Sequence, residues 1–168
     1  MDMEKLQAQL SELPLYYYNM IDPKTLEFSE RIRHICTAEC PMYNKTYACP
    51  PAVGAVSACR EKCLGYANCL LIGTVAEVYD IADIAETLAT RPAHEEITNQ
   101  VGELLRAQGV EPYILSTEAC AHCAHCRYPD APYRHPDRMF PCVESHGILV
   151  TDLAEKHGID FLAGNNLV

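Results

Sequence analysis

Residues 69–75 read Cys-Leu-Leu-Ile-Gly-Thr-Val, a short and continuously apolar run. A run of this length and composition is typical of a strand that is buried on both faces. Two amphipathic helical patterns follow it, over residues 80–88 and 92–109, and a second short apolar run, Pro-Tyr-Ile-Leu-Ser, occupies residues 112–116. Because helices alternate with short apolar strands, the sequence predicts a small α/β or α+β fold.

The segments before and after this middle part also carry regular patterns. Apolar residues at helical spacing over 3–13 predict an opening helix, and residues 15–21, Leu-Tyr-Tyr-Tyr-Asn-Met-Ile, predict a strand. Residues 29–51 are interrupted by cysteines and prolines, which favours a looped binding segment over a regular element. Helical spacing returns over residues 56–66 and again over 151–157.

The ten cysteines fall in two segments, residues 36–69 and 120–142, that flank a cysteine-free helical middle. A chain of 168 residues can bury a core without disulfides or metals, so the cysteines need a separate explanation. The second segment begins just after the strand predicted at 112–116, and ligands of α/β proteins usually lie past a strand end. We therefore predict a single metal-binding domain over residues 1–168, with a small sheet flanked by helices and cysteine-rich metal-binding loops at the strand ends.

Charge and hydropathy exclude several classes of protein. The 13 Lys and Arg against 23 Asp and Glu give a formal charge of −10, which disfavours nucleic acid and anionic membranes as partners. No stretch approaches the ~20 apolar residues of a membrane span, and residues 1–5 lack the basic start of a signal peptide. We expect a cytoplasmic protein, in which cysteines at short spacings are more often metal ligands or redox centres than disulfides.

The most specific motif is Cys120-Ala-His-Cys123-Ala-His-Cys126. Its thiols are separated by two residues each, as in the iron-sulfur runs of bacterial ferredoxins, and three thiolates can hold three irons of a cubane cluster. A zinc site with His122 or His125 as a nitrogen ligand is the alternative, because zinc accepts mixed sulfur and imidazole ligands. Thiols without metal are a third interpretation.

Cys36, Cys40 and Cys49 form a second candidate set. The spacing matches no single rule, but neighbouring prolines, Pro41 and Pro50 among them, stiffen the segment as wrapping around an inorganic core requires. The alternative is a proline-rich surface loop with ordinary free thiols.

The remaining cysteines are less clearly assigned. Fifteen residues separate Cys142 from Cys126, so Cys142 can loop back as a fourth ligand. Cys59 and Cys63 share a helical face, and we expect core packing for at least one of them. Cys69 lies inside an apolar strand pattern and is predicted to be a core residue.

Several motifs occur together along nearly the whole chain: Cys36-x3-Cys40-x2-Tyr43, Tyr47-Ala48-Cys49-Pro50-Pro51, Cys120-x2-Cys123-x2-Cys126, Pro132-x-Arg134-x-Pro136 and Glu144-x-x-Gly147-Ile148. In these motifs the sequence resembles a cysteine-rich domain-of-unknown-function family of predicted metal-binding proteins. The resemblance implies a cytoplasmic protein of bacteria or archaea, commonly anaerobes, that holds iron-sulfur clusters and has no settled reaction. It also implies the ligand positions Cys36, Cys40, Cys49, Cys120, Cys123 and Cys126.

The chain departs from the family pattern at a few positions. The family usually has a cysteine directly before the arginine of its Cys-Arg-x-Pro stretch, where this chain has Tyr133, and it more often has serine at the position of Cys142. The fourth ligand of the Cys120 run has therefore moved to Cys142, or that cluster has only three protein thiolates. The family also tends to have a tryptophan near its Cys-Pro-Pro motif, where this chain has Tyr47.

The leading hypothesis is an iron-sulfur protein with one or two [4Fe-4S] clusters that exchanges single electrons with a redox partner protein, to which its acidic surface steers it. A second hypothesis is an enzyme in which a three-cysteine cluster leaves one iron open as a Lewis acid, with Arg134, His135 or Glu144 as substrate groups. The third is a zinc-structured interaction module without redox activity.

Overall fold

The computed structural model describes residues 1–117, 119, 120, 122–159 and 166–168. Its contacts divide the chain into two compact units. We name the first the sheet unit, which comprises Met1–Ile21, Cys69–Tyr113 and Ala154–Val168, and the second the cysteine unit, which comprises Asp22–Asn68 and Ile114–Leu153. A single metal-binding domain over residues 1–168 stays a prediction.

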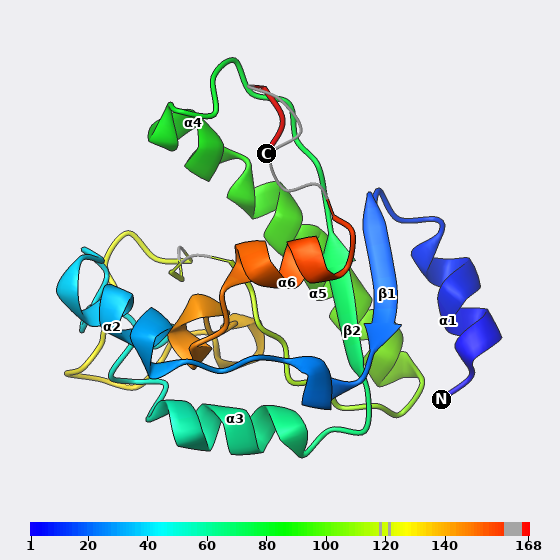
Figure 1. Ribbon diagram of the computed structural model, residues 1–168, viewed down its shortest axis with the longest axis horizontal. Helices are drawn as coiled ribbons and strands as arrows, with labels where there is room; N and C mark the ends of the chain where they lie inside the picture. Colours follow the sequence, from blue (N-terminus) through cyan, green and yellow to red (C-terminus); the bar gives the residue numbers. More distant parts are fainter. Residues whose placement is uncertain (118, 121, 160–165) are drawn as a thin grey trace. The chain divides into compact units, whose positions relative to one another are not determined.

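The sheet unit contains the small sheet that the sequence predicts. Strand β1 (Tyr17–Ile21) pairs antiparallel with β2 (Cys69–Gly73), and the two lie side by side in Figure 1. With the helices that accompany them, these strands form a small α/β fold, as predicted. Strand β2 is half-buried along its length and not buried on both faces as its apolar run predicts, because in the described residues it pairs with β1 alone.

Among the described residues, three helices lie wholly within the sheet unit: α1 (Met3–Leu10), α4 (Ile84–Ala89) and α5 (Arg91–Ala107). Helix α4 begins later than its sequence pattern predicts, because the carboxylate of Asp83, and not that of Asp80, accepts two backbone N–H groups of the first turn. Helix α5 ends close to the predicted position, shortly before a glycine.

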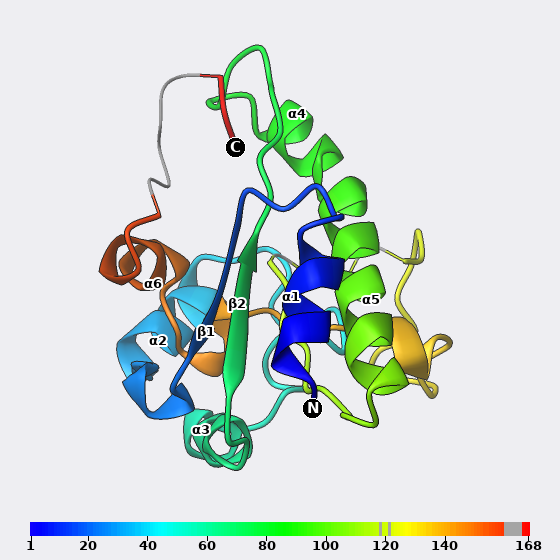
Figure 2. The same ribbon diagram turned by 90° about the vertical axis from the view of Figure 1, so that its right-hand side faces the viewer.

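The apolar faces of α1 and α5 meet in the core of this unit. Leu6 and Leu10 of α1 are almost completely buried together with Val101 of α5, and half-buried residues of both strands, including Met20 and Leu70, pack against them. Figure 2 shows α1 lying alongside α5. These helices are therefore stabilised by their amphipathic faces, which is why sequence periodicity predicts them well.

The cysteine unit is built from short helices and long loops. Its elements are η1 (Pro23–Thr25), α2 (Glu30–Ala38), α3 (Val56–Leu64), η2 (Pro136–Arg138) and η3 (Glu144–His146). A last helix, α6 (Val150–Lys156), begins in the cysteine unit and ends in the sheet unit.

Two of the predicted local structures are wrong. The segment 29–51 is not looped throughout, since its first part forms α2, which the Ser29 hydroxyl caps by accepting the Arg31 N–H at 3.2 Å. The residues predicted as a strand at 112–116 form no strand, and Ser116 alone makes an isolated parallel bridge, with Cys142. Cys59 and Cys63 of α3 are both buried, in agreement with core packing, whereas Cys69 is only half-buried in β2.

Candidate metal centres

The two cysteine segments, which lie far apart in the sequence, meet in one unit. Every cysteine except Cys69 belongs to the cysteine unit, and all ten are free thiols. The segments 22–68 and 114–153 are held together by a small number of polar contacts. These contacts decide which thiols become neighbours.

Arg33 of α2 makes several of these contacts. Its Nε donates to the Ser145 carbonyl at 2.7 Å, and its Nη1 donates to the Gly54 carbonyl at 2.6 Å. Nη2 donates to the same Ser145 carbonyl and lies 3.6 Å from the Cys59 sulfur. One guanidinium thus connects α2, the loop before α3 and η3, which the planar fork of arginine donors makes possible.

Gly147 holds the end of η3 against the start of α2. Its carbonyl accepts the Ser29 N–H at 2.8 Å, and its φ of +83° lies in the left-handed region. A Cβ at this position would lie 2.8 Å from the Ser29 carbonyl oxygen and 3.1 Å from Val56 Cγ1. The close approach therefore requires glycine on two grounds, backbone conformation and space.

Cys36, Cys40 and Cys49 form what we name the first thiol group. Burial raises the pKa of the Cys36 thiol, and the nearby Cys40 and Cys49 thiols raise it further, while Arg33 lowers it. Cys36 lies on α2, Cys40 follows the end of that helix, and Cys49 is buried in the loop beyond. The Cys40 and Cys49 thiols thus lie near enough to Cys36 to raise its pKa, and their role as ligands stays a prediction.

Cys142 lies beside the first thiol group. Its backbone N–H donates to the carbonyl of Ala48, the neighbour of Cys49, at 3.1 Å. Its thiol donates to Glu144 Oε2 at 3.0 Å, and the Cys36 thiol donates to the Glu144 backbone carbonyl at 3.9 Å. Burial and then Glu144 raise the pKa of the Cys142 thiol, with a further contribution from Cys49. The sequence leaves open whether Cys142 is the fourth ligand of the Cys120 run; in the structure Cys142 contacts Glu144 and the Ala48 carbonyl.

We name Cys120, Cys123 and Cys126 the second thiol group, and the hydroxyl of Tyr133 contacts the first of these thiols. The Tyr133 oxygen is 3.0 Å from Cys120 Sγ. Burial raises the pKa of the Tyr133 phenol, and the hydrogen bond to Cys120 and the charges of all three thiols raise it further. An oxygen thus accompanies the three sulfurs of this run.

The ring of Tyr133 is held by other aromatic side chains. Tyr47 contacts it edge-on with ring centroids 5.6 Å apart, and His135 does the same at 6.2 Å. Tyr47 is itself fixed by a hydrogen bond from its hydroxyl to the Ala131 carbonyl at 2.6 Å and by edge-on contact with Tyr128. Such edge-to-face contacts orient rings as well as bury them, so the Tyr133 hydroxyl is positioned by the protein.

The two histidines of the Cys120 run have other contacts. His122 Nε2 lies 2.6 Å from the Arg138 carbonyl oxygen, and His125 is exposed, with its carbonyl accepting from Arg134 at 3.3 Å. Across the described ranges, no set of three or more His, Cys, Asp or Glu side chains is arranged to hold a metal ion.

Buried hydroxyls near the first thiol group test whether this region suits a sulfur-rich metal group. Thr46 and Ser116 are each 2% exposed, and their hydroxyl oxygens have no hydrogen-bond partner among the described residues. Thr46 precedes Cys49 by three residues, and Ser116 pairs with Cys142. An unpartnered buried hydroxyl costs about 1–3 kcal/mol, and the sulfurs of a metal-thiolate centre accept hydrogen bonds. The two hydroxyls thus have unused donor capacity that suits sulfur acceptors, but the side chains of the described residues are not arranged around a metal ion.

Sequence reasoning missed Arg33, Thr46 and Ser116. An arginine inside a helix and hydroxyl residues near cysteines are common, so neither type of residue gives a signal by itself. A partial signal is the position of Thr46, three residues before a cysteine that is followed by two prolines. The burial of the two hydroxyls depends on the tertiary structure.

A family model described as Predicted metal-binding protein (DUF2284) matches residues 19–167. The match spans both thiol groups and most of the sheet unit. No curated protein and no solved structure matches the chain. Of the helices in the described ranges, none is both long enough and apolar enough to cross a membrane.

Proposed function

We propose that this chain, which belongs to the DUF2284 family of predicted metal-binding proteins, is an iron-sulfur protein that binds one or two [4Fe-4S] clusters and exchanges single electrons with a partner protein. The observation that supports the proposal is that both cysteine segments, distant in the sequence, belong to the cysteine unit, with every cysteine except Cys69. Soft thiolates are the ligands that iron-sulfur clusters use.

The proposed ligands are the cysteines of the two groups together with Cys142. A cluster bound there supplies a one-electron redox couple. The protein contributes burial, since Cys49 and Cys142 are both buried, and it contributes the hydroxyls of Thr46 and Ser116 as hydrogen-bond donors near the sulfurs. Burial and hydrogen bonds to sulfur are the factors that set a cluster's reduction potential.

Electron exchange requires one centre to approach the protein surface. Cys40 is exposed, whereas Cys49 of the same group is buried, so the first thiol group extends from the interior to the surface. The formal charge of −10 favours encounter with a basic face of the partner protein. We include a cytoplasmic location in the proposal, because free thiols persist in a reducing compartment.

Purification without oxygen, followed by iron and sulfide analysis and an EPR spectrum of the reduced protein, tests this function. We expect a brown protein with about 4 or about 8 irons per chain, a matching amount of sulfide and a signal from the reduced cluster. Cys49→Ser should lower the iron content, whereas the matched control Cys69→Ser should leave it unchanged, because Cys69 lies outside both groups. A colourless, EPR-silent protein with stoichiometric zinc would contradict the proposal and favour a zinc-structured interaction module.

The position of Tyr133 favours a second candidate function, an enzyme. A centre held by three thiolates leaves one metal position without a sulfur ligand, where the metal supplies Lewis-acid chemistry to a substrate oxygen or sulfur. Arg134 follows Tyr133 directly and is exposed; its Nη1 donates to the His125 carbonyl at 3.3 Å, which leaves its other donors to hold an anionic substrate group. Glu144, by contrast, contacts Cys142 beside the first thiol group. Small anions or thiols that alter the EPR spectrum of the reduced protein would support this function, and a spectrum insensitive to them would contradict it.

A further inference from the structure

We infer that α4 and the loop before it form a docking surface for a positively charged protein segment that carries apolar side chains. We name it the α4 surface. It consists of four exposed apolar side chains and three exposed carboxylates from the same stretch of sequence: Val75, Tyr79, Ile84 and Leu88, with Glu77, Asp80 and Asp83. The α4 surface lies wholly within the sheet unit, so the inference does not depend on a metal in the cysteine unit.

Large apolar side chains are unusually exposed on the α4 surface. Tyr79 is 94% exposed and Ile84 is 72% exposed. Single exposed apolar side chains are common on proteins, but several within one short stretch mark a site of interaction. Ile84 and Leu88 are four residues apart on α4 and therefore share one face of that helix. No residue of α4, all of which the structure describes, is buried, so the fold leaves this apolar face to solvent.

The backbone at Tyr79 is held on both sides although its side chain is exposed. Val78 before it is buried, and the Val78 N–H donates to the Asn166 carbonyl at 2.9 Å. The Glu86 carboxylate of α4 accepts the Tyr79 N–H at 2.8 Å and the Asp80 N–H at 3.2 Å. Because the loop is already fixed to α4, a partner that covers the tyrosine ring loses little free energy in ordering the chain.

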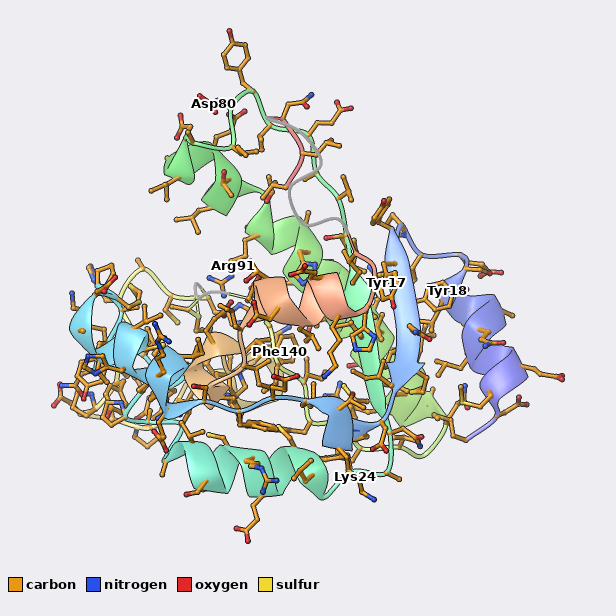
Figure 3. All side chains as sticks on the ribbon, in the orientation of Figure 1. Tyr17, Tyr18, Lys24, Asp80, Arg91 and Phe140 are labelled. Atoms are coloured by element: carbon orange, nitrogen blue, oxygen red, sulfur yellow. The ribbon has the colours of Figure 1, made fainter. Side chains whose placement is uncertain are left out.

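The carboxylates of the α4 surface shape the loop and keep acceptors for a partner. Figure 3 labels Asp80 in the loop that precedes α4. Its Oδ1 accepts the Ala82 N–H at 2.9 Å, and Asp83 Oδ1 accepts the Ala85 N–H at 2.9 Å. An ionised carboxylate has two oxygens and about four acceptor sites, so both exposed groups can also accept from lysine or arginine of a partner.

The negative charge of the chain is concentrated in the sheet unit. Its sequence has 4 Lys and Arg against 13 Asp and Glu, a formal charge of −9, whereas the cysteine unit has 9 against 10, a formal charge of −1. Residues 74–90 contain four acidic residues and no Lys or Arg. Arg91, the next residue, is paired with Glu95 at 2.7 Å, and both side chains are only 10% exposed. The field that attracts a basic partner is therefore centred on the sheet unit.

This charge selects among the possible occupants of the α4 surface. A second copy of the chain, joined by a two-fold axis, would place the same carboxylates opposite one another, and like charges in contact are costly. Anionic membranes and nucleic acid are repelled for the same reason. A basic protein segment with apolar side chains fits both features, since its apolar groups cover Tyr79 and Ile84 while its cations pair with Asp80 and its neighbours.

Peptide binding to the full-length protein tests the inference. The probe is a fluorescent synthetic amphipathic helix of leucine and lysine, and its affinity is measured by anisotropy. In one control peptide glutamate replaces lysine, and in the other serine replaces leucine. We expect only the leucine-lysine peptide to bind, with an affinity that falls several-fold as salt is added. Equal binding of the lysine-serine peptide would overturn the inference, because charge alone would then suffice. The measurement does not require iron, so it is independent of the proposed function.

Two variants test the apolar part of the α4 surface. Tyr79→Ser should raise the Kd of the leucine-lysine peptide about tenfold. The matched control is Tyr16→Ser, which removes another exposed tyrosine of the sheet unit and should leave the Kd unchanged. Equal effects of the two variants would overturn the inference. Dimers of the wild type that form with rising concentration and are abolished by Tyr79→Ser would identify a second copy as the occupant and would also overturn it.

Two double variants test the carboxylates. Glu77→Gln with Asp80→Asn removes two charges from the α4 surface and should raise the Kd several-fold. Glu96→Gln with Glu103→Gln removes the same charge from the exposed side of α5 and should have little effect. An equal rise in Kd for the two double variants would show that only the net charge of the chain attracts the peptide, contrary to the inference. Cooperative unfolding in urea verifies that each variant is folded.

Discussion

Replacement of Gly147 by alanine tests the contact that holds η3, and with it the Cys142 segment, against α2. Two costs follow from the structure. A non-glycine residue in the left-handed conformation, here with φ of +83°, costs about 1–2 kcal/mol. In addition, the new Cβ would lie 2.8 Å from the Ser29 carbonyl oxygen, a backbone atom that cannot turn aside as a flexible side chain does.

Forcing a methyl group into such a tight contact costs typically about 1–3 kcal/mol. The two costs together predict that Gly147→Ala lowers the free energy of unfolding by about 2–5 kcal/mol. Gly54 of the same unit provides the matched control. Its φ is +84°, but no atom lies within 4 Å of the position that its Cβ would take. Gly54→Ala should therefore carry only the conformational cost, about 1–2 kcal/mol.

Urea unfolding followed by tyrosine fluorescence measures both variants, since the chain has ten tyrosines and no tryptophan. The difference between the two variants isolates the contact with Ser29. Iron content adds a second readout, because displacement of η3 moves the Cys142 segment and should lower the iron content in Gly147→Ala alone. Equal losses of stability in the two variants would refute the reasoning.

Three further predictions concern other parts of the molecule. Arg33→Lys should lower the free energy of unfolding by about 1–3 kcal/mol, because lysine lacks the planar fork that reaches two backbone carbonyls. The exposed control Arg31→Lys should change this free energy by less than about 0.5 kcal/mol. Urea unfolding of both variants measures the difference. Thr46→Val should stabilise the metal-free chain by about 1 kcal/mol, since it removes an unpartnered buried hydroxyl. It should not stabilise the metal-loaded chain, in which the hydroxyl donates to a sulfur. Thermal unfolding that shows a gain of stability in both forms would contradict this role of the hydroxyl. Burial lowers the pKa of His94, so the neutral ring is favoured in the fold. The contribution of His94 to the free energy of unfolding should be fully present above the ordinary histidine pKa of about 6.5, and it should decrease as the pH falls from there, by up to about 1.4 kcal/mol per pH unit. If the free energy of unfolding of His94→Gln depends on pH as steeply as that of the wild type, this prediction is wrong.

Local patterns predict the helices of the sheet unit because each pattern contains the information that forms its helix. The apolar face of α5 and the glycine after it lie within one stretch of sequence, and the predicted helix agrees with Arg91–Ala107. The pairing of strands, by contrast, depends on residues that are distant in the sequence. Residues 112–116 have a strand-like composition, yet only Ser116 pairs, and its partner Cys142 is remote in the sequence.

The candidate site divides in the same way. The Cys-x2-Cys-x2-Cys run is local, so its three thiols are recognised directly, and in the structure the first of them contacts the Tyr133 hydroxyl. The first thiol group draws on residues from 36 to 49, and no spacing rule connects them. The prolines around Cys40 and Cys49 indicate an irregular loop, and for this reason the sequence does not predict α2. The hydroxyl of Ser29 caps the start of this helix.

The sequence by itself determined the α/β class and the membership of a metal-binding family, because composition, short spacings and periodicity are properties of neighbouring residues. Only the tertiary structure decided which thiols are neighbours. Cys142 lies with Cys49 because backbone hydrogen bonds join residues 48, 116 and 142, and these bonds form only when distant segments pack together.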